Sequence, residues 1–180
     1  MKFKMLGIVF EIRFSFVLIL AFAIIFELDS LLYVLLFAVL HETGHLAALY
    51  IQHKRADKIV VSFNGFGLVH TCRFTFWQEF CFLLAGIAVN LLFTVADICR
   101  EINLSLLVLN ILPIYPLDGG RLLKLVLNRA FSLHISDAVF RMVSAVFIAA
   151  VLFICVYFKN LNLFLICIYS VVYSINNSID

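Results

Sequence analysis

The chain has 180 residues, of which 65% are hydrophobic and only 13% are charged, and its formal net charge is +2. Soluble domains contain about 45–50% apolar residues, so this composition excludes an ordinary soluble protein and indicates an integral membrane protein. The few basic residues form no stripe interleaved with polar residues, which argues against a nucleic-acid-binding surface. The lipid bilayer is therefore an expected partner, and no nucleic acid is.

Apolar runs of about 20 residues, bounded by charged residues, predict about six membrane-spanning helices. A signal peptide is the competing interpretation of the first run, but no cleavage site with small residues follows it, so we expect a retained anchor. The expected fold class is an all-α polytopic membrane protein with these helices: Leu6 to Phe26, Leu31 to Ile51, Phe76 to Ala96, Ile102 to Leu117 with a continuation to Leu127, Ala138 to Phe158, and Leu161 to Ile175.

The distribution of Lys and Arg sets the expected orientation, because cytoplasmic loops carry an excess of these residues. With the N-terminus inside, all of the 13 Lys and Arg residues except Arg100 and Lys159 lie in or near cytoplasmic segments. Six spans then place both the N- and the C-terminus in the cytoplasm.

The second expected helix contains His-Glu-Thr-Gly-His at residues 41–45. In a helix, His41 and His45 lie on one face, about 6 Å apart along the axis, so both imidazoles can bind a single Zn²⁺. Glu42 lies beside the metal, where it can take a proton from a zinc-bound water. Structural buried histidines are the alternative, but ionisable residues in hydrocarbon are costly and normally functional. The pattern predicts zinc-dependent hydrolysis.

A segment between the second and third helices, Lys58 to Thr71, has β-branched and aromatic residues on both sides of Asn64-Gly65. Asn-Gly in this setting is typical of a β-hairpin turn. One interpretation is an ordinary surface hairpin. The other is a small re-entrant β-hairpin that dips toward the metal and pairs with an extended substrate.

A catalytic zinc usually has three protein ligands, so the histidine pair needs a third. Asp118 is the candidate, because Pro113 and Pro116 break the fourth helix just before it. Counted as helical rise, the histidines lie about 15–21 Å and Asp118 about 24 Å from the outer side, so both motifs fall in the inner half of the bilayer. A simple turn at Asp-Gly-Gly is the alternative role of this residue.

These two motifs resemble those of the site-2 protease family of intramembrane zinc metalloproteases. The strings that carry the resemblance are His-Glu-x-x-His at residues 41–45 and Asn-x-x-Pro-x-x-Pro-Leu-Asp-Gly-Gly at residues 110–120. The likeness covers nearly the whole chain and is strongest to the bacterial sporulation member, which acts on a membrane-associated sigma-factor precursor. It implies a bacterial cell membrane, a membrane-associated regulatory protein as substrate, and membrane inhibitors or regulators as further partners.

The resemblance also implies roles for single residues. His41, His45 and Asp118 correspond to the family's metal ligands, Glu42 to its catalytic base, and Asn110 to a polar residue that engages substrate near the metal.

A departure from the family pattern affects the third helix. Many members have a Gly-Pro pair before an Asn, whereas here Gly86 is followed by Ile87 and only Asn90 remains. Asn90 is therefore either a substrate-binding residue or a hydrogen-bonding residue between helices.

The expected domain organisation is a single intramembrane metalloprotease domain, residues 1–180, without the soluble C-terminal CBS domain of the sporulation member. Two rival functions share part of the pattern. A prenyl-protein protease shares the first motif but completes its site without Leu117-Asp118-Gly119-Gly120. An inactive relative that only holds membrane partners would not need Glu42. We therefore expect a zinc metalloendopeptidase.

Overall fold

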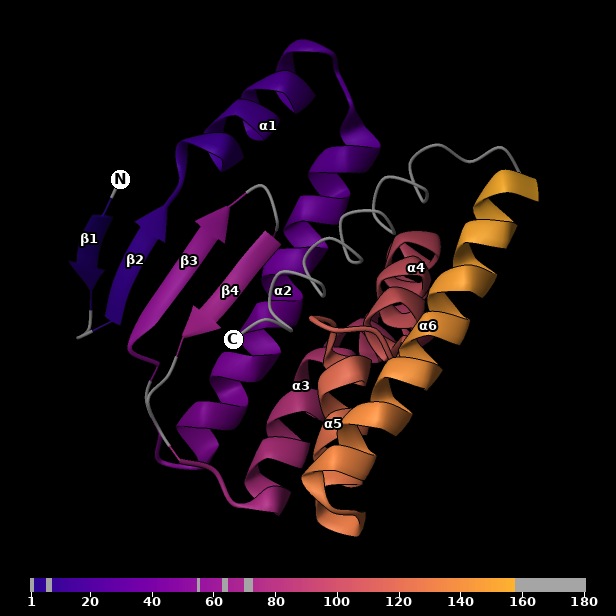
Figure 1. Cartoon of the computed structure of the whole chain (residues 1–180). Coiled ribbons are helices and arrows are strands. Elements are labelled where there is room, and N and C mark those ends of the chain that lie inside the picture. Colours follow the sequence, from indigo (N-terminus) through magenta and orange to yellow (C-terminus); the bar gives the residue numbers. More distant parts are fainter. Residues whose placement is uncertain (1, 6–7, 55, 63–64, 70–72, 158–180) are drawn as a thin grey trace. The chain divides into compact units, whose positions relative to one another are not determined.

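The computed structural model describes residues 2–5, 8–54, 56–62, 65–69 and 73–157 (Figure 1). The chain divides into two compact units, Met1–Leu107 and Val108–Asp180. The elements are β1 (Lys2–Met5), β2 (Ile8–Ile12), α1 (Phe14–Ile25), α2 (Asp29–Ile51), β3 (Lys58–Ser62), β4 (Gly65–Val69), α3 (Phe76–Val95), α4 (Arg100–Ile111), α5 (Asp118–Ala130) and α6 (Leu133–Tyr157).

The described residues form six helices, which confirms a predominantly helical fold, but a four-stranded sheet in the first unit corrects the all-α expectation. Its strand order is β1-β2-β3-β4, and β2 pairs with β3 in parallel while the two outer pairs are antiparallel (Figure 1). The predicted hairpin is confirmed as β3 and β4, with Ile59 opposite Leu68, although its turn lies outside the described residues. The hairpin is thus half of a larger sheet, and β3 is an inner strand.

The expected first helix, Leu6 to Phe26, is wrong in its N-terminal part. Residues 8–12 form β2, and α1 has only 12 residues. Such a helix is about 18 Å long, short of the roughly 30 Å of a hydrocarbon core. Charged and apolar residues alternate along Lys2–Met5, which favours strand β1. In β2, the sheet pairs the carboxylate of Glu11 with cations, whereas a helix in lipid would leave this charge buried without them.

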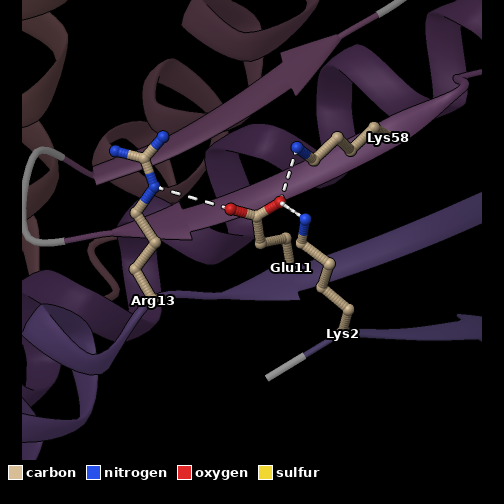
Figure 2. Close-up of polar contacts among 4 residues, drawn as sticks. All are labelled: Lys2, Glu11, Arg13 and Lys58. Carbon is tan, nitrogen blue, oxygen red and sulfur yellow. Dashed lines mark ion pairs between the residues drawn. The ribbon is translucent and has the colours of Figure 1, made fainter.

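The carboxylate of Glu11 forms ion pairs with three cationic side chains (Figure 2). Its Oε2 lies 2.5 Å from Nζ of Lys58 on β3 and 3.4 Å from Nζ of Lys2 on β1, while its Oε1 lies 3.8 Å from Nε of Arg13. The hydrogen bond from Lys58, and then that from Lys2, hold the pKa of the Glu11 carboxyl below its ordinary value against the opposing effect of burial. This carboxylate therefore ties together β1, β2 and β3.

Three helices in the described part of the chain are long and apolar enough to cross a membrane: Asp29–Ile51, Phe76–Val95 and Leu133–Phe153. They correspond to the second, third and fifth expected spans. The last expected span, Leu161 to Ile175, lies outside the described residues. The expected total of six spans is not reached within the described part, where α1 and α4 have only 12 residues each.

Helices α2 and α3 pack against each other and form the core of the first unit. Phe37 of α2 meets Phe93 of α3 edge to face, with ring centroids 5.2 Å apart. At the other end, Gln52 Nε2 donates to the carbonyl oxygen of Gln78 at 3.0 Å. The same Gln78 forms a capping box with Thr75 that fixes the start of α3. Contacts near both ends of α2 and α3 therefore fix how the two helices pack.

The break that Pro113 and Pro116 predict in the fourth helix is confirmed in the second unit. Helix α4 ends at Ile111 and α5 begins at Asp118. A Cβ on Gly119 would lie 2.1 Å from the carbonyl oxygen of Ile111, and one on Gly120 would lie 2.5 Å from that of Ile114. The two glycines are therefore needed for the start of α5 to pack against the preceding chain.

Candidate metal centre

His41 and His45 lie on the buried face of α2, with 5% and 3% of their surface exposed. Their Nε2 atoms are 3.2 Å apart. Two imidazole nitrogens bound to one tetrahedral zinc, each about 2.0–2.1 Å from it, lie about 3.3 Å apart. The spacing of the pair therefore fits a shared metal ion, as the i, i+4 spacing predicts.

Glu42 is half-buried and follows His41 directly on α2. Ligand-type atoms of His41, Glu42 and His45 all lie within 4.8 Å of one another. A carboxylate at this distance from the two nitrogens is well placed to bind the water that a metal ion would hold, and to exchange a proton with it. The structure thus brings the predicted base and the two predicted ligands together.

Helix α3 contacts both rings, at their Nδ1 and at their Nε2 atoms. The Nδ1 of His45 lies 2.8 Å from the carbonyl oxygen of Phe82, and the Nδ1 of His41 lies 3.1 Å from the side-chain Nδ2 of Asn90. Between them, a Cβ added to Gly86 would lie only 2.6 Å and 2.4 Å from the Nε2 atoms of His41 and His45. Gly86 therefore leaves room at the side of the rings where a metal would bind.

Asp118 and Asn110 belong to the second unit. Asp118 is 6% exposed and is the first residue of α5, so its carboxylate lies at the positive end of the helix dipole. Asn110 lies in the last turn of α4 and is half-buried. A buried carboxylate beside a break in an apolar segment has the donor chemistry of a third zinc ligand.

Sequence reasoning did not identify Phe82 and Gly86 as partners of the histidines. Their signal is the spacing of Phe82, Gly86 and Asn90 at i, i+4 and i+8, which places all three on one face of α3. For Asn90, the interhelical hydrogen bond considered above is observed, with His41 as the partner.

Comparisons with known proteins give one family match and one match in fold. The sequence model of Peptidase family M50 matches residues 92–154, a region that contains Asn110 and Asp118 but not the histidine pair. The chain has the fold of the Site-2 Protease from Methanocaldococcus jannaschii, with a TM-score of 0.68 and 21% identity, over 94% of this chain and 91% of that one. No curated protein sequence matches the chain.

Proposed function

We propose that this protein is an intramembrane zinc metalloendopeptidase of the site-2 protease type. The observation that carries the proposal is the cluster of His41, Glu42 and His45 in an apolar helix of 23 residues, long enough to cross a membrane. The match to Peptidase family M50 and the site-2 protease fold support the same chemistry. The proposed reaction is hydrolysis of a peptide bond in or near a membrane-associated segment, toward the cytoplasmic side.

In this proposal, His41, His45 and Asp118 hold the zinc ion. Asp118 has the hard oxygen donor that often completes a two-histidine site, and it starts α5 at the break in an apolar segment. When bound, zinc would supply Lewis acidity, which lowers the pKa of its water to roughly 7 and polarises the scissile carbonyl.

Glu42 moves the proton. Its carboxylate takes a proton from the attacking water as the water oxygen bonds to the carbonyl carbon. When the carbon–nitrogen bond breaks, Glu42 returns that proton to the leaving amine, and the other product is a carboxylate. Asn110 is proposed to hold the substrate backbone near the zinc through its side-chain amide.

Substrate presentation is assigned to the sheet. A helical segment hides its scissile carbonyl in internal hydrogen bonds, so a protease needs its substrate extended, and an open strand edge can hold it so. Strand β3 is an inner strand, which leaves β4 as the edge of the hairpin in the described sheet, and β4 contacts α2. We therefore assign substrate pairing to β4 and retain the proposal that the hairpin is re-entrant.

The substrate proposed from the motif resemblance is a membrane-associated regulatory protein, with a sporulation sigma-factor precursor as one candidate. The proposed setting is a bacterial cell membrane with both termini cytoplasmic, one intramembrane protease domain, and membrane inhibitors or regulators as further partners.

Co-expression with tagged, membrane-anchored precursors tests this function. The wild-type chain should convert a true substrate to a shorter product whose new terminus, mapped by mass spectrometry, lies in or near the membrane segment. His41→Ala, which removes a proposed zinc ligand, should leave the precursor intact. Equal conversion by the wild type and by His41→Ala would contradict the proposal.

A further inference from the structure

Helix α3 holds the two histidines by the ring nitrogens that a metal would not use. The Nδ1 of His45 is paired with the backbone oxygen of Phe82, and the Nδ1 of His41 with the side chain of Asn90. The Nε2 atoms of both rings meet at Gly86. Each ring therefore has one nitrogen engaged by α3 and the other directed toward the candidate metal position.

The contact at Phe82 determines the tautomer of His45. A backbone carbonyl oxygen can only accept a hydrogen bond, so the Nδ1 of His45 must carry the proton. The Nε2 of His45, which lies 3.2 Å from the Nε2 of His41, then carries the lone pair that can bind a metal. Histidines that ligate metals almost always donate their other ring N–H to such an acceptor.

The same requirement applies to His41, where the partner is an amide. An Asn side chain has one acceptor and one donor atom at nearly equal positions, and half a turn about its last torsion exchanges them. Nδ2 lies 3.1 Å from the Nδ1 of His41, and no hydrogen-bond partner of Oδ1 is found within the described part of the chain. With the amide turned, Oδ1 accepts a hydrogen bond from Nδ1–H, and the Nε2 of His41 then carries the lone pair that can bind metal.

We infer that Asn90 is a positioning residue for the metal centre: its amide oxygen holds the Nδ1–H of His41 and so fixes the ring and the tautomer that bind zinc. This inference rests on the proposed zinc site. Asn90 has no exposed surface, and its amide contacts the ring itself. That placement suits an outer-shell partner of a ligand better than a residue that must meet substrate.

Zinc affinity of purified protein, measured by competition with a chelator, tests this role without any substrate. Loss of an outer-shell partner typically weakens metal binding about 10–100-fold, and that is the expected effect of Asn90→Ala. Asn90→Asp keeps an acceptor for Nδ1–H and should restore affinity to near the wild-type value. Thermal unfolding of each variant shows that the measurement is made on folded protein.

Asn103→Ala is the matched control. Asn103 is also fully buried in the first unit, but its Nδ2 donates to the backbone oxygens of Ile98 and Cys99 and not to a histidine. The variant should lose stability and keep its zinc affinity.

The outcomes separate this inference from the proposed function. If the wild type binds zinc and His41→Ala does not, unchanged affinity in Asn90→Ala would overturn the role of Asn90 alone. Equal weakening in Asn90→Ala and Asn90→Asp, or in Asn90→Ala and Asn103→Ala, would also overturn it. A wild-type chain that binds no zinc would remove the metal site and this inference together.

Discussion

Gly86→Ala should damage the proposed metal centre although it adds only one methyl group. The new Cβ would lie 2.4 Å from the Nε2 of His45 and 2.6 Å from that of His41. Ordinary contact begins at 3.4 Å, so the rings must withdraw by up to about 1 Å. Their Nδ1 hydrogen bonds, now 2.8 Å and 3.1 Å long, would then exceed hydrogen-bonding distance.

The size of the effect follows from these two lost contacts. Each outer-shell partner is worth about 10–100-fold in metal affinity, so zinc binding should weaken by at least about 100-fold. Overpacking costs about 1–3 kcal/mol of folding stability, which outweighs the gain of about 1 kcal/mol in helix propensity from Gly to Ala.

Chelator competition measures the zinc affinity, and thermal unfolding in detergent measures the stability. Leu84→Ala is the control on the same helix, because Leu84 is 38% exposed and its truncation should leave zinc affinity unchanged. Zinc affinity of Gly86→Ala within twofold of the wild type would refute the packing of α3 against the histidine rings.

Three further predictions concern the proposed third ligand, the sheet and the proposed substrate-binding edge. Asp118→Ala should weaken zinc binding by more than the roughly 10–100-fold that the loss of an outer-shell partner causes. Asp137→Ala, which removes an ion-paired carboxylate in the same unit, should leave zinc binding unchanged. Full zinc occupancy in Asp118→Ala would limit the role of Asp118 to the turn at Asp-Gly-Gly. Because its pKa in the folded protein is lowered, Glu11 stabilises the sheet above its ordinary pKa of 4.5 and loses this effect as the pH falls through the lowered value. The melting-temperature difference between wild type and Glu11→Gln should therefore be present at neutral pH and vanish in acid. A difference that does not depend on pH would contradict the ion cluster. Backbone N–H groups of neighbouring residues point to opposite edges of a strand, so of Gly67→Pro and Leu68→Pro one removes a donor to β3 and the other removes a donor at the open edge. The variant that leaves the sheet intact should still impair cleavage, because the substrate has lost a pairing donor. Normal cleavage by that folded variant would exclude strand addition at β4.

The cluster of His41, Glu42 and His45 could be predicted from sequence because it depends on local geometry. His41 and His45 share a face by helical periodicity alone, and Glu42 follows from its place between them. The break before Asp118 could also be predicted from local sequence, because two prolines and two glycines indicate it. Such features need no knowledge of how distant segments pair.

The parts that sequence reasoning missed depend on contacts between distant segments. Strand β2 pairs in parallel with β3 across two intervening helices, and Glu11 has the cation of Lys58 as a partner only once that pairing exists. The role of Gly86 likewise appears only when α3 packs on α2. Apolar composition also merged β2 with α1 into one expected span, because hydropathy does not distinguish a buried strand from a helix.

In the proposed mechanism Glu42 performs the chemistry while the histidines hold the metal, and Glu42→Gln tests this division of roles most directly. Zinc content and cleavage of the same purified sample should separate. The variant should retain about one zinc per chain, because an amide at this position leaves the proposed ligands in place. Cleavage should fall by roughly 10²-fold or more, because the amide cannot accept the proton of the attacking water. Near-normal cleavage by zinc-loaded Glu42→Gln would contradict the account.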